Sequence, residues 1–374
     1  MTKHRSPRPL PGALLVILTV VAIAAGGCSS VASPQGWASP VQDGDLLLAA
    51  HRDELFALDA ADLAVRWSFP PAGNDEIDPV ALYGTPAFMG EEMVLVPTYD
   101  GVLYALERES GNLRWQYDTG DALIGGVAVS EAGDAAYFGS ANGNVYALDA
   151  EGVPIWSAPF ETDEPVWSTP SLAGDTLFVT SLDRRVYAIA VETGAQRWEF
   201  KADAGIGSTP VVAGGSVFVG AFDSQLRALG ETSPYERWSV KADNWFWSRP
   251  LEAAGTVYAG SLDGRVYAID AATGEERWPP FDAGGPIRAA PALVGEVLFV
   301  VDTDGNIHGI DTETGAAAFA APFAIGDEVL ADLLVRESPG ETEPPELVIV
   351  TTAGNLVRVD PVDLRQIAIT ELGG

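Results

Sequence analysis

Short hydrophobic runs alternate with polar turns along most of the chain, and eight of these runs share one form. Each run is strand-like and ends in an aromatic or similar residue followed by a small and then an aliphatic residue. The eight copies begin at Phe56, Tyr104, Tyr146, Tyr187, Arg227, Tyr267, His308 and Val357. Their first positions lie 40 to 49 residues apart. A repeat of this period, made of short strands, is typical of a β-propeller blade. The pattern therefore predicts an all-β, eight-bladed propeller of four-stranded blades.

The copy from Ser248 to Trp278 shows how one blade is written. We expect Arg249–Glu252 to open its inner strand, Thr256–Gly260 and Arg265–Asp270 to form the second and third strands, and Glu276–Trp278 to begin the fourth. Asp263-Gly264 favours a tight hairpin between the second and third strands, because both residues tolerate a positive φ. Asp270 to Gly274 predicts a polar corner between the third and fourth strands, in which Gly can adopt the left-handed conformation.

A tryptophan follows six of the runs about ten residues later. These residues are Trp67, Trp115, Trp156, Trp198, Trp238 and Trp278; Phe319 takes the place in the seventh copy, and the eighth has none. The pattern Ala-x-Asp-x-x-Thr-Gly-x-x-x-Trp is similar to the tryptophan-docking motif of the PQQ-type propellers, the quinoprotein alcohol dehydrogenase-like superfamily. The resemblance covers about residues 37 to 370. It implies that the six tryptophans are structural and pack between neighbouring blades.

The first 36 residues carry the signs of a secretion signal. Lys3, Arg5 and Arg8 precede an apolar run, Ala13 to Ala25, that is too short to span a bilayer as a helix. The run ends in Ala25-Gly26-Gly27-Cys28, which resembles a bacterial lipobox, and Cys28 is the only cysteine. We expect residues 1–27 to be a lipoprotein signal peptide, residues 28–36 a lipidated Cys28 with a short tether, and residues 37–374 the propeller. The alternative is an ordinary signal peptide with a chance cysteine.

Composition excludes one large class of partner. The formal net charge is -32, with 53 acidic against 21 basic residues. Because phosphate binding needs a basic surface, nucleic acid is not an expected partner.

Catalytic residues are hard to find in this sequence. The PQQ-type resemblance offers a quinoprotein dehydrogenase as an alternative, but members with that activity carry a pair of adjacent cysteines that this chain lacks. His51 and His308 lie in remote copies and suggest no triad. Asp302 to Asn306 looks like a calcium loop, yet its Gly stands at the fourth position rather than the sixth. We therefore expect no enzyme, no cofactor and no metal site.

A further possibility is a binding site for a ligand at the channel mouth. Counting three residues back from the proline that opens each inner strand, or from its equivalent, leads to Trp37, Tyr83, Ile124, Trp167, Gly207, Trp247, Arg288 and Val329. Trp245, Phe246 and Trp247 are consecutive, and strand alternation cannot bury all three on one side. The candidate binding ring is Trp37, Tyr83, Trp167, Trp245, Trp247 and Arg288. Such a ring suits a peptide partner or the stacking of a sugar, although aromatic residues at blade junctions are often buried packing.

A lipid-anchored PQQ-type propeller without cofactor residues resembles the BamB family, scaffolds of the outer-membrane β-barrel assembly machinery. The resemblance implies a non-enzymatic, extracytoplasmic scaffold for protein partners, among them membrane proteins. It would lie on the periplasmic face of an outer membrane or, in an organism without one, on the outer face of the cytoplasmic membrane. Glycan or small-ligand binding at the channel mouth remains the alternative.

Two insertions lengthen the repeat, and they are candidate contact surfaces because the other connections are short. They are Pro70 to Leu82, between the first two blades, and Ser338 to Glu346, inside the eighth. The short tether should hold the propeller close to its membrane and leave from the face that carries the hairpin acids. Those acids are Asp53, Asp100, Asp183, Asp223, Asp263 and Asp304. Alternatively, residues before Trp37 add an outer strand to the eighth blade and close the ring.

Overall fold

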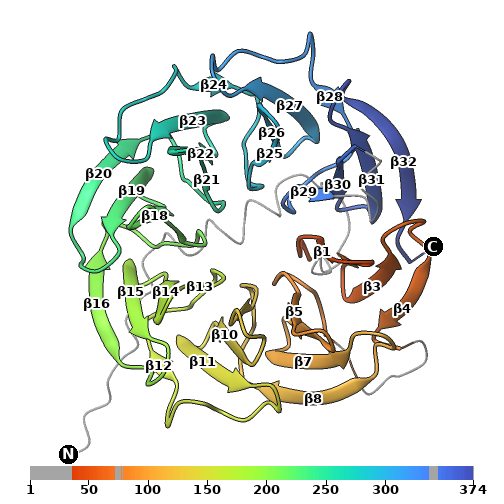
Figure 1. Ribbon diagram of the computed structural model, residues 1–374, viewed down its shortest axis with the longest axis vertical. Coiled ribbons are helices and arrows are strands. Elements are labelled where there is room, and N and C mark those ends of the chain that lie inside the picture. Colours follow the sequence, from red (N-terminus) through yellow and green to blue (C-terminus); the bar gives the residue numbers. More distant parts are fainter. Residues whose placement is uncertain (1–35, 72–76, 78, 337–343, 374) are drawn as a thin grey trace, which may run out of the picture. The chain divides into compact units, whose positions relative to one another are not determined.

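The computed structural model describes residues 36–71, 77, 79–336 and 344–373. Within these ranges the strands form eight separate sheets of four strands each, set around a common axis like the blades of a propeller (Figure 1). Each sheet consists of four strands that are consecutive in the sequence, and neighbours pair antiparallel. The prediction of an all-β, eight-bladed propeller is confirmed.

The first four blades begin near the N-terminus and follow the ring in sequence order. Their strands are β1 (Val41–Asp43), β2 (Leu46–His51), β3 (Glu54–Asp59), β4 (Val65–Phe69), β5 (Ala87–Met89), β6 (Met93–Pro97), β7 (Val102–Glu107), β8 (Leu113–Asp118), β9 (Ala128–Val129), β10 (Ala135–Gly139), β11 (Asn144–Asp149), β12 (Phe160–Glu161), β13 (Ser171–Ala173), β14 (Thr176–Thr180), β15 (Arg185–Ala190) and β16 (Gln196–Lys201).

Blades five to eight repeat this plan to the C-terminus. Their strands are β17 (Val211–Ala213), β18 (Ser216–Gly220), β19 (Gln225–Gly230), β20 (Glu236–Lys241), β21 (Leu251–Ala253), β22 (Thr256–Gly260), β23 (Arg265–Asp270), β24 (Phe281–Asp282), β25 (Ala292–Val294), β26 (Val297–Val301), β27 (Asn306–Asp311), β28 (Phe323–Ala324), β29 (Leu334–Arg336), β30 (Glu346–Val350), β31 (Asn355–Asp360) and β32 (Arg365–Glu371).

The outer strand of blade six corrects one prediction. The expected strand at Glu276–Trp278 is reduced to an isolated bridge between Ile269 and Glu276, and the strand itself is β24, Phe281–Asp282. Pro279 and Pro280 stand between them. Proline has no N–H to donate to the ladder, so pairing stops and resumes after it. The two-residue outer strands β12 and β28 likewise follow a proline directly.

The core lies between the blades. In β2, Leu46 and Leu48 pack against blade two, whereas Leu47 and Ala49 pack against blade eight. Successive side chains of a strand point to opposite faces, so a strand with a blade on each side needs an apolar residue at every position. This explains why the second and third strands read as nearly continuous hydrophobic runs.

The six tryptophans that follow the runs join each of the first six blades to the next; we call them the docking tryptophans. The indole Nε1 of Trp67 donates to the backbone carbonyl of Arg108 at 2.8 Å, and Trp238 donates to Ala271 at 3.0 Å. The other four make the same bond to Ala150, Val191, Glu231 and Thr312. A Cβ on Gly274 would come within 2.6 Å of Trp238. The corner glycine is therefore needed for close approach as well as for its positive φ.

Closure of the ring needs no exchanged strand among the described residues. Blade one uses only β1–β4 and blade eight only β29–β32. The seam between them is held by a hydrophobic cluster that includes Leu47, Phe56 and Val348, and by the hydroxyl of Ser39, which accepts from the backbone N–H of Asp332 at 3.1 Å. The alternative, a strand from residues before Trp37, concerns positions outside the described residues, apart from Gly36, which belongs to no strand.

Parts of both insertions turn out to be structural. Leu82 is 1% exposed, and its carbonyl accepts from the backbone N–H groups of Trp37 and Ala38. Glu346 begins β30, is 7% exposed and pairs with Arg358. Leu82 and Glu346 therefore belong to the fold rather than to a free loop. Residues 72–76, 78 and 337–343, which include most of the second insertion, lie outside the described residues. The described residues include no helix long and apolar enough to cross a membrane.

Candidate binding site at the channel mouth

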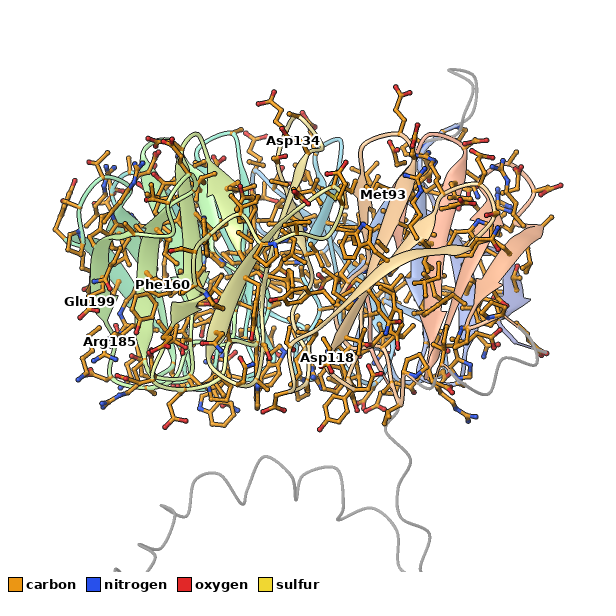
Figure 2. All side chains as sticks on the ribbon, turned by 90° about the horizontal axis from the view of Figure 1, so that it is seen from below. Met93, Asp118, Asp134, Phe160, Arg185 and Glu199 are labelled. Carbon is orange, nitrogen blue, oxygen red and sulfur yellow. The ribbon has the colours of Figure 1, made fainter. Side chains whose placement is uncertain are left out.

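The two faces of the propeller differ in what they carry. One face bears the hairpins between the second and third strands, such as Asp100-Gly101 and Asp263-Gly264; we call it the hairpin face. Asp118 lies at its rim, and Asp134 lies at the opposite rim, on what we call the corner face (Figure 2). The chain enters every blade from the hairpin face, close to the channel, and this is where the predicted ring residues lie.

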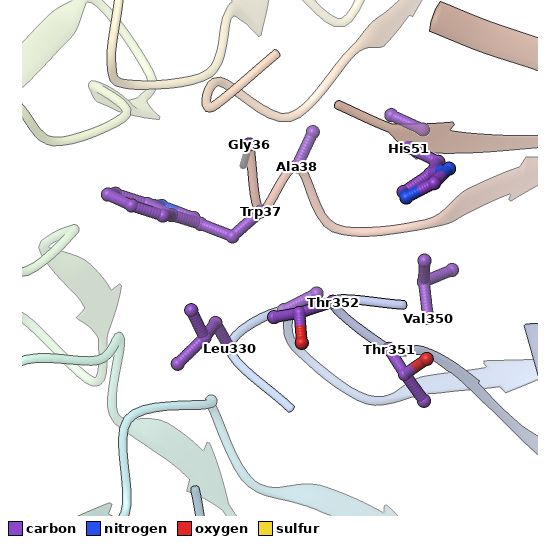
Figure 3. Close-up of a pocket in the computed structure, with 10 residues that line it drawn as sticks. Gly36, Trp37, Ala38, His51, Leu330, Val350, Thr351 and Thr352 are labelled. Carbon is purple, nitrogen blue, oxygen red and sulfur yellow. The ribbon is translucent and has the colours of Figure 1, made fainter. Parts of the chain in front are cut away.

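Strand alternation sorts the residues that enter each blade. Phe246 is 1% exposed and packs into the core against Tyr267. Its neighbours Trp245 and Trp247 remain partly exposed on the other side. The same alternation corrects the position named for blade eight. Val329 is 1% exposed and belongs to the core, whereas Leu330 is partly exposed and lies beside Trp37 (Figure 3).

Arg288 brings residues of three blades together. Its guanidinium carbon lies 4.0 Å from the ring centroid of Trp37 and 4.7 Å from that of Trp247. These residues lead into blades seven, one and six, and blade eight separates seven from one along the ring. Trp37 reaches away from the seam between blades one and eight (Figure 3). The contacts therefore bridge blades that are not all neighbours, at the mouth of the channel.

Aromatic rings extend this group on both sides. The ring centroids of Trp37 and Tyr83 are 4.1 Å apart. On the other side Phe222 stacks on Trp245 at 4.8 Å and on Trp247 at 5.3 Å. A Cβ on Gly207 would lie 2.7 Å from the ring of Phe222, so the glycine at this ring position makes room for the aromatic ring.

The structure thus brings five of the six candidate ring residues together: Trp37, Tyr83, Trp245, Trp247 and Arg288. Trp167 makes none of the ring contacts of this group. Sequence reasoning missed Phe222, and Tyr99, whose ring lies 5.1 Å from that of Tyr83. Both stand directly before a hairpin aspartate, and an aromatic residue at that otherwise polar turn was the available signal.

Arg288 is charged and partly buried without a polar partner. Its Nε is covered and lacks a hydrogen-bond acceptor, and within the described ranges the side chain forms no ion pair. Burial lowers the pKa of the Arg288 guanidinium to about 10, and the nearby charge of Glu328 opposes this shift only in part. The group is still protonated at neutral pH, because its pKa stays well above 7.

Several hairpin acids serve the blade itself. Asp183 accepts from the hydroxyl of Tyr187 at 2.5 Å, and Asp263 accepts from that of Tyr267 at 2.7 Å. Asp223 forms an ion pair with Arg227 at 2.6 Å. These carboxylates brace the hairpin against the third strand. Asp53, Asp100 and Asp304 are exposed. Asp100 accepts from the hydroxyls of Thr98 and Tyr104, so Asp53 and Asp304 are the hairpin acids most open to a partner.

The histidines and the suspected calcium loop also have structural surroundings. The imidazole of His51 packs against Gly354 in the seam between blades eight and one. Asp302 is 2% exposed and accepts from the backbone and side-chain amides of Asn306, as a hairpin residue does. His308 lies 3.6 Å from Asp302. The described residues contain no group of three or more acidic, histidine or cysteine side chains placed to hold a metal.

A family model matches most of the chain. A sequence model described as "Outer membrane protein assembly factor BamB" matches residues 19–167, 141–244 and 232–372. A curated protein of that description, from Burkholderia pseudomallei (strain K96243), is 26% identical over 117 residues, which are 31% of this chain and 29% of that protein. In this match the chain spans less than a third of its relative's length.

Solved structures show the same architecture. BamB from Moraxella catarrhalis is similar, with a TM-score of 0.69 and 20% sequence identity, over 84% of this chain and 91% of that one. The computationally designed Ika8 protein has a TM-score of 0.70 at 15% identity, over 86% of this chain and 96% of the designed one. At these identities the likeness concerns the fold.

Proposed function

Because the chain belongs to the family of the outer membrane protein assembly factor BamB, we propose that it is a lipid-anchored, non-enzymatic scaffold that binds protein partners at the cell envelope. The observation that carries the proposal is the aromatic group at the channel mouth. Five partly exposed side chains lie together on the hairpin face: Trp37, Tyr83, Trp245, Trp247 and Arg288. Aromatic residues and arginine dominate the energetic centres of protein interfaces.

A scaffold fits this mouth better than a quinoprotein does. A quinoprotein site needs acidic ligands for the calcium ion that accompanies the quinone, and the described residues contain no group of three or more acidic, histidine or cysteine side chains placed to hold a metal. No catalytic step is therefore proposed. Glycan binding at the same rings is the alternative, since indole faces also stack on sugars.

The membrane anchor belongs to the same proposal. Cys28 lies outside the described residues, and its support is the sequence pattern in front of it. We expect Cys28→Ser to move the protein out of the membrane fraction, while the control Ser30→Ala stays bound. Cys28→Ser protein that still sediments with membranes after a carbonate wash would contradict the anchor.

Crosslinking in intact membranes tests which face binds. A photoreactive amino acid at Asp304, which is exposed on the hairpin face, is compared with one at Asp134, which is exposed on the corner face. Asp263 is less suitable, because its carboxylate is bound to Tyr267. We expect adducts to an envelope protein from position 304 and few from position 134. Adducts confined to position 134, or none from either, would overturn the proposal.

A further inference from the structure

Arg288 differs from Arg66 and Arg227, whose guanidinium groups are held by carboxylates. Arg66 pairs with Asp45 and Asp59, and Arg227 pairs with Asp223 and Glu236. The chain offers 53 acidic residues, yet within the described part of the chain none of them forms an ion pair or a hydrogen bond with Arg288. Its close contacts are two indole faces.

In this arrangement the N–H donors of the Arg288 guanidinium remain available for hydrogen bonds. A guanidinium has five N–H donors, and the indole faces of Trp37 and Trp247 satisfy none of them as a hydrogen-bond acceptor would. Removing such a group from water without pairing it costs free energy. The cost is recovered when an acceptor arrives, and the two rings already hold the guanidinium in place.

We propose that Arg288 binds a carboxylate of a partner polypeptide, an acidic side chain or a chain terminus, while Trp245, Trp247 and Phe222 contact the apolar residue beside it. A carboxylate matches the planar guanidinium with two parallel hydrogen bonds. The inference rests on the proposed scaffold function and names the chemistry that the partner must present.

The charge of the protein argues for a carboxylate carried on a polypeptide. A net charge of -32 repels small free anions over the whole surface. Glu328 adds local repulsion beside Arg288. A polypeptide can offset this repulsion through its other contacts, including basic residues placed opposite the exposed Asp53 and Asp304. The preferred segment therefore has one acidic residue between aromatic residues, with basic residues farther away.

The test uses two synthetic peptides that differ in one group. Ac-Lys-Ala-Phe-Glu-Phe-Ala-Lys-NH2 and its counterpart with Gln in place of Glu are titrated into the full propeller, with calorimetry and the Nε–Hε NMR signal of Arg288 as readouts. Acetate, inorganic phosphate and maltohexaose are titrated separately as free anions and as a neutral glycan. We expect the Glu peptide to bind at least about tenfold more tightly than the Gln peptide and to shift the Arg288 signal, because a charged, bidentate pair replaces a neutral contact.

Three variants assign the effect to Arg288. Arg288→Gln should bring the two peptides to equal affinity, and Arg288→Lys should keep only part of the difference, because ammonium lacks the planar fork. Arg249→Gln is the matched control, since Arg249 is exposed and lies two residues after Trp247. It should leave the preference for Glu unchanged. Melting curves of all variants confirm that they are folded.

The inference is overturned if neither peptide binds at millimolar concentration, if both bind wild-type protein equally, or if acetate, phosphate or maltohexaose binds as tightly as the Glu peptide. It is also overturned if Arg288→Gln keeps the preference. The scaffold proposal has its own outcome: crosslinking from Asp304 to an envelope protein would persist if only the Arg288 site is wrong.

Discussion

Tryptophan does two different things in two regions of this propeller. The chain has ten tryptophans, of which six are docking tryptophans between blades. The other four, Trp37, Trp167, Trp245 and Trp247, lie at the channel mouth; we call them the inner tryptophans. Trp238 is 8% exposed and its indole N–H is bonded. The inner tryptophans are partly exposed, and among the described residues none of their N–H groups has a hydrogen-bond acceptor.

The difference lies in what surrounds the same side chain. Each docking tryptophan lies between two blades and donates to a backbone carbonyl, and five of the six also pack against a glycine. Of the inner tryptophans, Trp37 and Trp247 pack on Arg288 and on other rings, and Trp245 packs on Phe222. Among the described residues none of the N–H groups of the inner tryptophans is buried without a partner, so each is open to solvent, as the binding proposed at the channel mouth requires.

The largest expected effect is the loss of a docking tryptophan. Trp238→Ala removes an indole that is 8% exposed and bonded to Ala271. We expect it to lower the free energy of unfolding by about 3 to 5 kcal/mol, as truncations of large buried aromatic residues do. Chemical denaturation measures the change. A loss below about 1 kcal/mol would contradict this difference between the two sets, since a docking tryptophan would then contribute no more to the free energy of unfolding than an inner tryptophan.

Substitution of two glycines separates the cost of a positive φ from the cost of moving the indole that packs against the glycine. Gly274 and Gly255 both have positive φ, at +76° and +78°, but only at Gly274 would a Cβ collide with a neighbour, the ring of Trp238 at 2.6 Å. Gly255→Ala should cost about 1 to 2 kcal/mol from the left-handed backbone alone. Gly274→Ala should cost about 1 to 3 kcal/mol more, because the indole must move. Equal losses in denaturant unfolding would show that the corner glycine serves only its φ.

The seam between blades eight and one has no docking tryptophan, and we expect its stability to depend on pH through His51. Burial, with the nearby positive charge of Arg52, lowers the pKa of His51 below its ordinary value of 6.5. The unfolded chain then binds the proton more tightly than the folded one. Stability is complete above pH 6.5 and falls as the pH drops from there through the lowered pKa of the folded state. We expect the melting temperature of wild type to fall more than that of His51→Gln between pH 7.5 and 5.5; parallel curves would refute this.

The smallest effect on stability is expected at the channel mouth. Trp247→Ala removes ring contacts with Phe222 and Arg288 but no seam between blades. We expect a loss of about 1 kcal/mol or less, the scale of one aromatic contact and one cation–π contact. Crosslinking from Asp304 to the partner should nevertheless weaken severalfold. A loss of stability like that of Trp238→Ala, with crosslinking unchanged, would assign Trp247 to the fold instead.

Much of the fold could be predicted because the turns and strands of each blade depend on residues that are close together in the sequence. The hairpin Asp263-Gly264 and the corner around Gly274 act through φ preferences of a few residues. The outer strand of blade six could have been predicted as well, since Pro279 and Pro280 forbid the pairing that the docking motif suggested there. The wrong choice of Val329 instead of Leu330 as the ring position of blade eight has a different cause. Blade eight has no proline at the start of its inner strand, and a shift of one residue moves a side chain to the other face.

The number of blades, the turns and the six docking tryptophans follow from the amino-acid sequence alone, because each depends on residues within one repeat and on the repeat beside it. The position of Arg288 between Trp37 and Trp247 follows only from the folded ring. The three come from separate blades and meet only when the ring has closed, so the distances across the channel depend on the whole ring. The missing partner of Arg288 is likewise invisible in a chain with 53 acidic residues, because only packing decides which of them can reach it.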